Sequence, residues 1–331
     1  MATIVLGSDF LPDIARQLQG ELPDHSVREI DIGTREHPAE DIERYESLLA
    51  EAEVIVPLRG YIDERVLARA PLCRLIQQFG TGVDMVDLAA AQRRRIPVCN
   101  VPSRAGGNAD SVAEMALFHL IGAGREFRRL QQLVANEDFA APFGGSLYGK
   151  TVCIVGFGNV GTALARLLRP FGCRVIGIDN RVIAIRGRAE RGMGSGSVEV
   201  WTEQRLEEAL GGADYVVVSV PLIPSTRGLL GPGQFRAMKW GTRIVNISRG
   251  ATIDREALLA ALASGQVAAA GLDVFWEEPV SADDPILAEN VLATPHCAGL
   301  TDHMLAGTSR IAAENIQRVL DGRRPRYRMD G

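Results

Sequence analysis

Thr151-Val-Cys-Ile-Val-Gly156-Phe-Gly158-Asn-Val-Gly161 is the stretch that decides the fold, and it lies near the middle of a 331-residue chain. Its first five residues form an apolar run typical of a buried parallel strand, and Gly156 allows a tight turn into a helix. A glycine triplet alone is a weak signal. Together with a second apolar strand and the acid Asp179 beyond it, the triplet predicts a dinucleotide-binding unit that starts mid-chain.

The later residues of this motif would serve the phosphates of a dinucleotide. Gly158 has no side chain to block a pyrophosphate, and the amides of Asn159 and Val160 would bind phosphate oxygens at the positive end of the helix. Gly161 allows the helix to lie close to the strand. The motif therefore predicts where a pyrophosphate would bind.

Asp179 follows the next predicted strand, where a carboxylate can accept hydrogen bonds from ribose hydroxyls and would repel a 2′-phosphate. Arg181 is an opposing signal, because an arginine just beyond this strand can accommodate the phosphate of NADP. We therefore expect NAD as the cofactor, with NADP less favoured.

Composition and charge agree with a protein that handles small molecules. The chain is 46% hydrophobic, long enough for two domains with substantial cores, and carries a formal net charge of -5. This charge gives no general attraction to nucleic acid or to an anionic membrane, so we expect neither as a partner. Arginines cluster locally at 181, 186, 188 and 191 and at 323, 324, 326 and 328, where we expect solvated loop and tail surfaces.

The five cysteines, at 73, 99, 153, 173 and 297, are odd in number and include no Cys-x-x-Cys pair. This pattern argues against a disulfide framework and against a zinc site, so no metal is expected. Most should be buried thiols, with Cys297 of most interest because it follows a histidine discussed below. The chain shows no cationic leader and no apolar run that could span a bilayer, so we expect a cytoplasmic protein.

The first hundred residues alternate short apolar strands with amphipathic helices, which is typical of a doubly wound α/β domain. The predicted strands lie at 3–6, 27–32, 54–57, 75–79 and 98–100. A segment rich in breakers, Pro102–Asn108, predicts a hinge. An apolar helix at 111–122 and a more polar, irregular arm at 125–149 follow.

From residue 151 onward, strands recur in the pattern of a parallel sheet, at 152–155, 174–178, 215–220, 243–247, 267–272 and 291–294. Residues 295–300 predict a second crossing, after which a final helix at 304–320 returns to the first domain. We therefore predict an α/β protein of two doubly wound domains. A Rossmann domain, 104–298, is inserted in a discontinuous flavodoxin-like substrate domain, 1–103 and 299–331.

Three later segments place polar groups just beyond apolar strands: Val245-Asn-Ile-Ser-Arg249-Gly250, Gly271-Leu-Asp273-Val-Phe-Trp-Glu277-Glu278-Pro279 and Ala293-Thr-Pro-His296-Cys-Ala-Gly299. Because the carboxyl ends of parallel strands border the ligand crevice, we expect Arg249, Asp273, Glu278 and His296 to approach a bound nicotinamide. Reduction of a carbonyl needs a proton donor, which imidazole can supply, and a fixed cation, which guanidinium can supply. A carboxylate touching the imidazole would favour its protonated form and orient the ring.

Each of these residues has a structural alternative. A lone arginine after a strand is usually on the surface, and a charged pair such as Glu277-Glu278 is most often a solvated loop. His296 competes with His119, which lies on the apolar helix and is expected in the core, and with three histidines expected to be exposed, at 25, 37 and 303.

In this combination the chain resembles the D-isomer-specific 2-hydroxyacid dehydrogenases over essentially its whole length. The resemblance rests on the glycine triplet, on Val220-Pro-Leu-Ile-Pro-Ser-Thr226 and on the three later segments in the family's order. It implies that Arg249 binds the substrate carboxylate and carbonyl and that Glu278 pairs with His296. It also implies that His296 exchanges a proton with the C2 oxygen while hydride moves to or from nicotinamide C4.

The resemblance implies further contacts. Asp273 matches the residue that holds the nicotinamide carboxamide, and five other positions match residues beside the cofactor: Pro221, Thr226, Ile247, Ser248 and Gly299. In the first domain, Gly80-Thr81-Gly82-Val83-Asp84 resembles the substrate loop, whose amides around Thr81 and Gly82 receive the carboxylate. Arg59 lies in a loop that can reach the distal end of the substrate. The family usually forms a homodimer through the cofactor domain, with the arm at 125–149 contributing.

The leading hypothesis is an NAD(P)-dependent oxidoreductase that acts on a CH–OH group and interconverts a small 2-keto acid and a D-2-hydroxy acid, glyoxylate or hydroxypyruvate first. A second enzymatic hypothesis is a short-form 3-phosphoglycerate dehydrogenase. Formate dehydrogenase is disfavoured, because its relatives pair the histidine with glutamine where this chain has Glu278. A non-enzymatic alternative is an NAD-sensing binding protein similar to the transcriptional corepressors that share this fold. Turnover of many per second on one small acid would argue against it.

Overall fold

The computed structural model describes residues 1–7, 11–34, 38–181 and 198–329. The chain divides into two compact units, Met1–Asn108 with Leu300–Gly331, and Ala109–Gly299. The sequence predicts domain boundaries after residues 103 and 298. The roles assigned to the two domains stay predictions. His37 and three arginines of the first predicted basic cluster, at 186, 188 and 191, lie outside the described residues.

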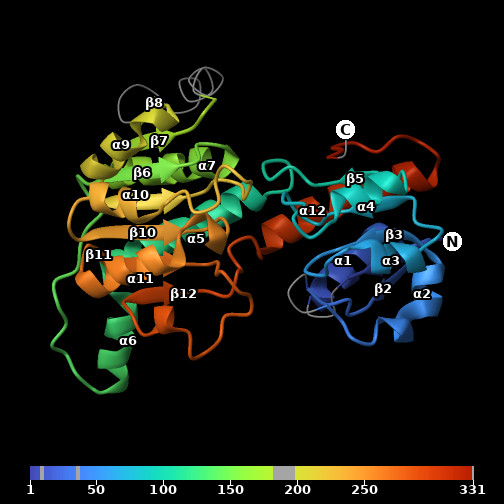
Figure 1. The fold of residues 1–331 in the computed structure, drawn as a ribbon, viewed down its shortest axis with the longest axis horizontal. Coiled ribbons are helices and arrows are strands. Elements are labelled where there is room, and N and C mark those ends of the chain that lie inside the picture. The colour runs from blue at the N-terminus through green and yellow to red at the C-terminus, as the bar shows by residue number, and fades with distance from the viewer. Residues whose placement is uncertain (8–10, 35–37, 182–197, 330–331) are drawn as a thin grey trace. The chain divides into compact units, whose positions relative to one another are not determined.

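The first unit is built on a parallel sheet, ordered β2-β1-β3-β4-β5 among the described residues (Figure 1). This order is that of a flavodoxin-like, doubly wound sheet, which confirms the predicted α/β fold class. Its elements are β1 (Thr3–Leu6), α1 (Pro12–Glu21), β2 (Ser26–Glu29), η1 (Ile42–Tyr45), α2 (Glu46–Ala50), β3 (Ala52–Val56), α3 (Glu64–Arg69), β4 (Leu75–Gln77), α4 (Leu88–Arg93), β5 (Val98–Cys99) and α12 (Asp302–Leu320).

Alternation along β1 shows why this sheet is covered on both faces. Ile4 and Leu6 join the core beneath α1 and α12, whereas Val5 joins the core beneath α2, α3 and α4. All three side chains are fully buried. The hydroxyl of Thr301 accepts a hydrogen bond from the Met304 amide and caps α12. The chain thus returns to its first sheet through its last helix.

The second unit is built on a parallel sheet, ordered β12-β11-β10-β9-β6-β7-β8 within the described ranges. Its elements are α5 (Asn108–Gly124), α6 (Phe127–Ala135), β6 (Thr151–Val155), α7 (Asn159–Leu168), η2 (Arg169–Phe171), β7 (Arg174–Ile178), β8 (Val198–Trp201), η3 (Glu203–Arg205), α9 (Leu206–Gly212), β9 (Tyr215–Val218), α10 (Pro232–Ala237), β10 (Thr242–Asn246), η4 (Gly250–Thr252), α11 (Arg255–Ser264), β11 (Val267–Leu272), η5 (Pro285–Leu287) and β12 (Val291–Ala293). The strands follow one another in opposite directions across the sheet on the two sides of the β9–β6 pair. A Rossmann sheet binds its ligand at this point.

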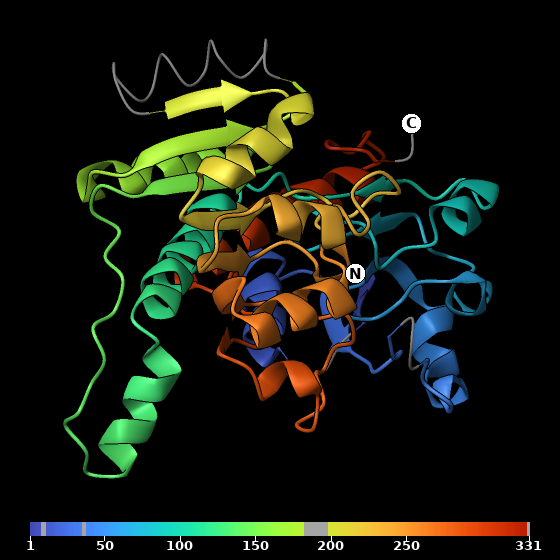
Figure 2. The ribbon, with the colours of Figure 1, turned by 60° about the vertical axis from the view of Figure 1, so that its left-hand side comes forward.

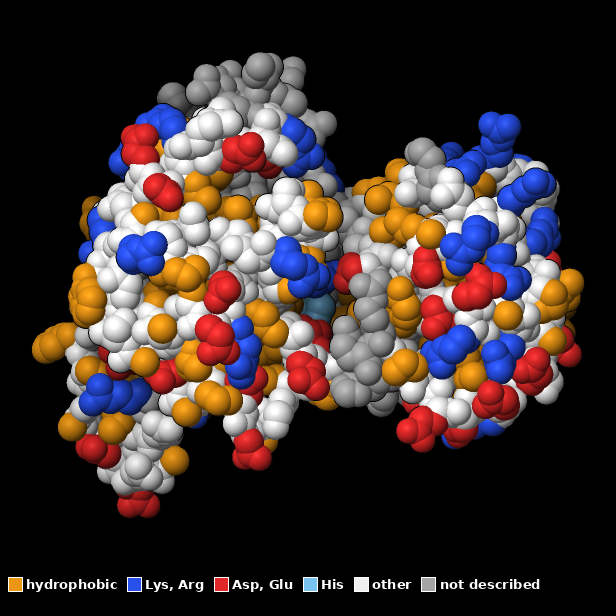
Figure 3. Space-filling model, in the orientation of Figure 1, with side chains coloured by type: hydrophobic (Ala, Val, Ile, Leu, Met, Phe, Trp, Pro, Cys, Tyr) orange, Lys and Arg blue, Asp and Glu red, His pale blue; other side chains and the backbone are white. Residues whose placement is uncertain are grey.

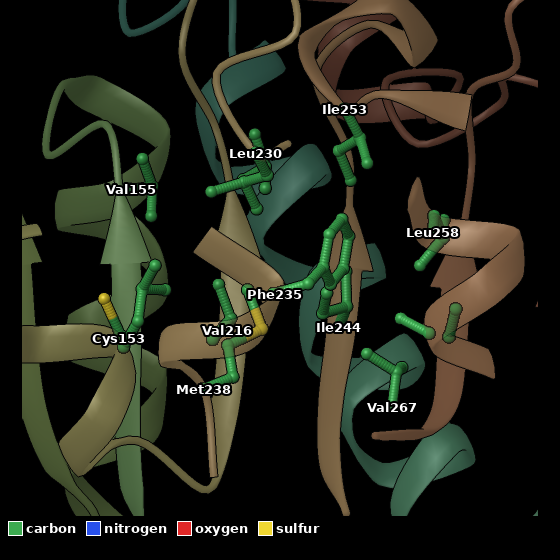
Figure 4. Packing of buried hydrophobic residues seen from close by; sticks show 14 of the residues in the cluster. Cys153, Val155, Val216, Leu230, Phe235, Met238, Ile244, Ile253, Leu258 and Val267 are labelled. Atoms are coloured by element: carbon green, nitrogen blue, oxygen red, sulfur yellow. The ribbon is translucent and has the colours of Figure 1, made fainter. Parts of the chain in front are cut away.

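Helices cover both faces of this sheet. Along β6, Cys153 and Val155 face the core under α9, α10 and α11, while Val152 and Ile154 face the core under α5 and α7. Figure 4 shows the first of these cores, in which Phe235 from α10 lies over the central strands. Burial of a large apolar side chain contributes about 1.5–3 kcal/mol, so these two layers hold the carboxyl edge of the sheet in place.

Two elements of the second unit were not predicted from the sequence. Edge strand β8 buries only Val200 of its four side chains, so its apolar alternation is weak. Helix α6 buries none of its side chains within the unit. Figure 2 shows α6 and the extended segment after it standing away from the rest of the second unit. Part of the predicted irregular arm is therefore a helix.

Candidate active site

The glycine triplet forms the turn between β6 and α7. Gly156 has φ +95, and a Cβ added to it would lie 2.7 Å from the Ser219 backbone, so only glycine fits. A Cβ on Gly161 would overlap the Gly156 carbonyl oxygen. Gly158, by contrast, faces space: the nearest atom to an added Cβ is a guanidinium nitrogen of Arg181, 3.8 Å away. Helix α7 begins directly after Gly158, so its amino-terminal end lies at this turn, as a phosphate site requires.

Asp179 lies directly after β7 and is 8% exposed. Its carboxylate accepts hydrogen bonds from the Phe157 amide (3.2 Å) and the Arg181 amide (2.9 Å). The Arg181 guanidinium also donates to it, with nitrogen–oxygen distances of 3.1 and 3.3 Å. The pKa of the Arg181 guanidinium is raised, chiefly by these hydrogen bonds. The acid that favours NAD and the arginine that favours NADP therefore form one ion pair.

The carboxyl edge of the sheet carries the predicted residues in a spatial order set by the strands. His296 follows β12, Asp273 and Glu278 follow β11, and Arg249 follows β10. Next come β9, β6 and β7, which end near Pro221, Gly156 and Asp179, in that order. The candidate catalytic residues thus follow three neighbouring strands, and the glycine turn, Pro221 and Asp179 follow the next three.

His296 and Glu278 are in direct contact. The ring Nδ1 of His296 lies 2.6 Å from Glu278 Oε2, and Glu278 Oε1 accepts a hydrogen bond from the Phe275 amide at 3.1 Å. Both side chains are half-buried, at 34% and 26% exposure. The neighbouring Glu277 is exposed. The carboxylate therefore holds the imidazole through its Nδ1.

The backbone of His296 has φ +53, which is uncommon for a residue other than glycine. Two carbonyls, those of Asp273 (2.7 Å) and Thr294 (3.0 Å), accept its amide hydrogen. The Asp273 carboxylate, 1% exposed, accepts the amides of Cys297 (3.0 Å) and Ala298 (2.9 Å) and the hydroxyl of Thr294 (2.6 Å). Asp273, to which the resemblance assigns a nicotinamide contact, thus also holds the turn that carries His296.

Arg249 directly precedes the short 3₁₀ helix η4 after β10. Its carbonyl accepts hydrogen bonds from the Asn246 amide group (3.0 Å) and the Thr252 hydroxyl (2.7 Å), and its guanidinium donates to the Ser248 carbonyl at 2.8 Å. A Cβ on Gly250 would overlap the Phe275 backbone, so this turn packs directly on the one after β11. Asn246 was not among the predicted site residues. A polar side chain at the end of a buried strand was the signal for it.

The remaining predicted cofactor positions lie on the same edge. The hydroxyl of Thr226 donates to the Pro221 carbonyl at 2.6 Å and closes that loop. Ile247 and Ser248 are nearly buried, and the Ser248 hydroxyl lies 2.9 Å from the Asn246 side-chain oxygen. Gly299 is the last residue of the second unit.

The predicted substrate residues belong to the first unit. The hydroxyl of Thr81 donates to the Val101 carbonyl at 3.2 Å, and the Thr81 carbonyl accepts a hydrogen bond from the Asn100 side chain at 2.8 Å. Thr81 itself is exposed, and Gly82 is half-buried. Arg59 is half-buried in the loop after β3.

The competing histidines lie elsewhere. His119 is fully buried, as expected, and His303 is exposed. His25 is half-buried rather than exposed, because its ring lies within hydrogen-bond distance of the Ala2 amide (3.2 Å) and the Gln317 side chain (3.1 Å).

All five cysteines are free thiols; four are buried and Cys297 is half-buried. Burial raises the pKa of Cys73 and of Cys153 to about 12, so both stay protonated. Across residues 1–7, 11–34, 38–181 and 198–329, no group of three or more His, Cys, Asp or Glu side chains is placed to hold a metal ion. No helix in the same ranges has both the length and the apolar character needed to cross a bilayer.

Comparison with known proteins points in one direction. The family model described as "D-isomer specific 2-hydroxyacid dehydrogenase, NAD binding domain" matches residues 117–298. A glyoxylate reductase from Korarchaeum cryptofilum is 35% identical over 262 residues, covering 77% of this chain and 75% of that protein. A D-3-phosphoglycerate dehydrogenase from Archaeoglobus fulgidus is 33% identical over 300 residues, covering 89% of this chain and 54% of that protein. The chain thus spans about half the length of this relative.

Solved structures agree with these sequence matches. A glyoxylate reductase from Paecilomyes thermophila superposes with a TM-score of 0.81 at 25% identity, covering 99% of this chain and 98% of that chain. The TT0316 protein from Thermus thermophilus gives a TM-score of 0.80 at 27% identity, covering 99% of both chains.

Proposed function

Because the chain belongs to the D-isomer-specific 2-hydroxyacid dehydrogenases, we propose that it reduces a small 2-keto acid to the D-2-hydroxy acid, reversibly and with NADH. Glyoxylate and hydroxypyruvate are the first substrates to test, since several similar proteins are glyoxylate reductases. The observation that carries the proposal is the His296–Glu278 contact beside the strand end that carries Arg249.

The second unit has the features that an NAD site needs. The space beside Gly158 and the amides of α7 would hold the pyrophosphate, and Asp179 at the end of β7 would accept the ribose hydroxyls. When bound, the cofactor supplies the hydride for reduction or accepts it for oxidation. Asp179 supports NAD as the main cofactor, and its ion pair with Arg181 keeps NADP as the less favoured alternative.

The proposed catalytic residues transfer the proton and hold the substrate. Protonated His296 donates its Nε2 proton to the carbonyl oxygen of the keto acid, and Glu278, 2.6 Å from Nδ1, stabilises the positive ring before the transfer. Arg249 holds the substrate carboxylate and polarises the carbonyl, which suits a fixed guanidinium. In the oxidation direction His296 takes the proton back, so the same ring serves as base.

The first unit would bind the other end of the substrate. The hydroxyl of Thr81 is directed to the Val101 carbonyl, so the backbone amides of Thr81 and Gly82, rather than the hydroxyl, would receive the carboxylate. Arg59 would contact the distal substituent of the acid. These three contacts are the part of the proposal that decides substrate size.

We also propose a homodimer formed through α5, α6 and the segment after them. Helix α6 buries no side chain of its own, and Phe139 and Phe143 in the following segment are fully exposed. Phe118 and Ile121 of α5 are also exposed, at 41% and 40%. An apolar surface of this kind marks an interaction site, and a second copy of the chain would cover it.

The five free thiols support a reducing compartment such as the cytoplasm.

A second candidate function is the oxidation of 3-phosphoglycerate, because a D-3-phosphoglycerate dehydrogenase matches 89% of this chain. The substrate would then carry a phosphate at its distal end, where Arg59 is the proposed contact. This candidate uses the same catalytic residues, so only the substrate separates the two.

A panel assay tests both candidates. Purified protein is given NADH or NADPH with glyoxylate, hydroxypyruvate, pyruvate and 3-phosphohydroxypyruvate, and oxidation of the cofactor is followed by absorbance. We expect turnover above about 1 per second on glyoxylate or hydroxypyruvate with NADH. Preference for the phosphorylated acid would favour the second candidate. Oxidation of neither cofactor by any acid would contradict both and favour a binding protein.

A further inference from the structure

A histidine outside the proposed catalytic group is connected to it by hydrogen bonds. His119 lies on α5 and is fully buried, and its Nε2 is 2.9 Å from the Thr294 hydroxyl oxygen. The Thr294 oxygen is in turn 2.6 Å from the Asp273 carboxylate. These contacts join a helix on one face of the sheet to the carboxyl edge of β11 and β12.

The number of hydrogens on each group determines which group donates in each of these hydrogen bonds. The Asp273 carboxylate already accepts two backbone amides, so toward Thr294 it also acts as an acceptor. Thr294 has one hydroxyl hydrogen and donates it to Asp273, so its oxygen must accept a hydrogen from His119 Nε2. Burial lowers the pKa of His119 to about 4, so the ring is neutral near pH 7. His119 is therefore the neutral Nε2–H tautomer.

The imidazole of His119 makes the folded protein less stable at one of its ring atoms. With the proton on Nε2, Nδ1 is an acceptor, and it has no hydrogen-bond partner among the described residues. A buried acceptor left in this way destabilises the folded protein, which a leucine would avoid. A Cβ added to Gly271 would lie 2.7 Å from His119 Cβ and 2.8 Å from its Nδ1, so the His119 side chain packs directly on this glycine. Packing alone does not account for an imidazole here.

This series of hydrogen bonds ends at the turn that carries His296. Asp273 receives the Thr294 hydroxyl and the amides of Cys297 and Ala298, so it connects both sides of His296. The turn includes a positive φ at His296, a conformation that the surrounding hydrogen bonds must maintain. A hydroxyl that turned away from Asp273 would weaken one side of this arrangement.

We propose that His119 is a positioning residue, which orients the Thr294 hydroxyl toward Asp273 and thereby holds His296 in register with Glu278. The role rests on the proposed function, because it matters only if His296 exchanges a proton with substrate. His119 itself touches neither substrate nor cofactor in this account. Its contribution is the single Nε2–H that Thr294 accepts.

Two pairs of variants separate this role from simple packing. His119→Leu and Thr294→Val remove the relay, whereas His119→Gln and Thr294→Ser keep a donor and a hydroxyl at the same places. We expect kcat for 2-keto acid reduction to fall about tenfold in the first pair, as misplaced catalytic groups do, with KM for NADH nearly unchanged. The second pair should stay within about threefold of wild type. The double variant His119→Leu/Thr294→Val should be no slower than Thr294→Val.

A second readout does not need turnover. Imidazole ¹⁵N chemical shifts report the tautomer and hydrogen bonding of each histidine, and His303→Gln provides a matched control on an exposed residue. We expect His119 to show the neutral Nε2–H form at pH 7. We also expect the His296 shifts to move in Thr294→Val and His119→Leu but not in Thr294→Ser or His303→Gln.

The two readouts keep the inference separate from the proposed function. If wild type reduces no keto acid, the proposed function fails, and the His296 shifts still decide whether the relay positions that ring. Unchanged His296 shifts in Thr294→Val, or a folded His119→Leu protein with wild-type kcat, would overturn the inference. Equal losses in the leucine and glutamine variants would also overturn it, because they would indicate packing. Thermal unfolding of each variant shows which proteins are folded.

Discussion

At the scale of single residues, the charge of Glu278 is the simplest part of the account to test. Glu278→Gln keeps the size of the side chain but removes the negative charge 2.6 Å from His296 Nδ1. The protonated ring loses its stabilising partner, so kcat for 2-keto acid reduction should fall by about tenfold or more. Steady-state kinetics measure this. The matched control is Glu277→Gln, which alters an exposed neighbour and should keep the wild-type kcat, whereas a wild-type kcat in Glu278→Gln would refute the assigned role.

Arg181 tests the choice of cofactor. Its guanidinium neutralises Asp179, so Arg181→Ala should leave the acid free to repel a 2′-phosphate. We expect the preference for NADH over NADPH to rise about tenfold, equivalent to ~1.4 kcal/mol. The measurement is kcat/KM for each cofactor. Arg174→Ala, which breaks an exposed pair with Glu199 on the neighbouring edge strand, is the control. A reduced preference for NADH in Arg181→Ala would count against this account.

His119 should also shape the acid stability of the protein. Its pKa is lowered from 6.5 to about 4, mainly by burial, although the Asp273 charge opposes the shift. Between these values the unfolded chain binds a proton that the folded chain does not, so stability falls as the pH drops from 6.5 toward 4. The loss at the low end is ~3 kcal/mol. The free energy of unfolding of wild type should therefore fall relative to that of His119→Gln as the pH drops from 6.5 toward 4, which denaturant unfolding measures. Parallel pH curves would show that His119 does not titrate in this way.

The residues differ in how far the sequence reveals them. Arg249, Asp273, Glu278 and His296 could be picked out because each follows an apolar strand, and a family pattern distinguished Glu278 from its neighbour. Asn246 and Thr294 also stand at the ends of buried strands, but their action through other groups shows only in the hydrogen bonds of their turns.

At the scale of elements, the two turns after β10 and β11 depend on each other. A Cβ on Gly250 would overlap the Phe275 backbone, and Phe275 in turn donates its amide to Glu278. Gly250→Ala must push these turns apart, so we expect a loss of about 2–4 kcal/mol in the free energy of unfolding and a lower kcat. Gly212→Ala is the control, because open space surrounds that glycine. Equal stability of the two variants would contradict the packing described.

Most strands could be predicted because they are buried on both faces and read as apolar runs. Strands β6, β7 and β11 are examples, because all residues but one are buried in each of these strands. Edge strand β8 was missed because it buries only one of its four side chains, so its apolar alternation is weak. Helix α6 was missed although its apolar residues recur at helical spacing, and it buries none of them within its unit.

At the scale of the whole molecule, the proposed dimer follows from the surface that α6 and the next segment leave uncovered. Phe139→Ser with Phe143→Ser removes two fully exposed aromatic side chains. We expect sedimentation velocity to show a dimer for wild type and a larger monomer fraction for this variant. Trp240→Ser, at another exposed site of the same unit, should stay dimeric. A monomeric wild type, or a double variant that dimerises as wild type does, would disprove this interface.

The charge distribution matches a protein of small-molecule chemistry. On the face shown in Figure 3, lysine and arginine side chains are interspersed with aspartate and glutamate side chains, without a single-sign field. The formal net charge of the chain is -5. What distinguishes the molecule is the order of groups along one sheet edge, from His296 beyond β12 to Asp179 beyond β7.

His296, Glu278 and Arg249 are proposed to act together in the reduction of a 2-keto acid by NADH. The product formed from hydroxypyruvate and NADH by wild type and by His296→Ala tests this most directly. We expect D-glycerate from wild type and a rate at least about a thousandfold lower from the variant, as loss of a proton donor requires. L-glycerate from wild type, or the same rate from both proteins, would contradict it.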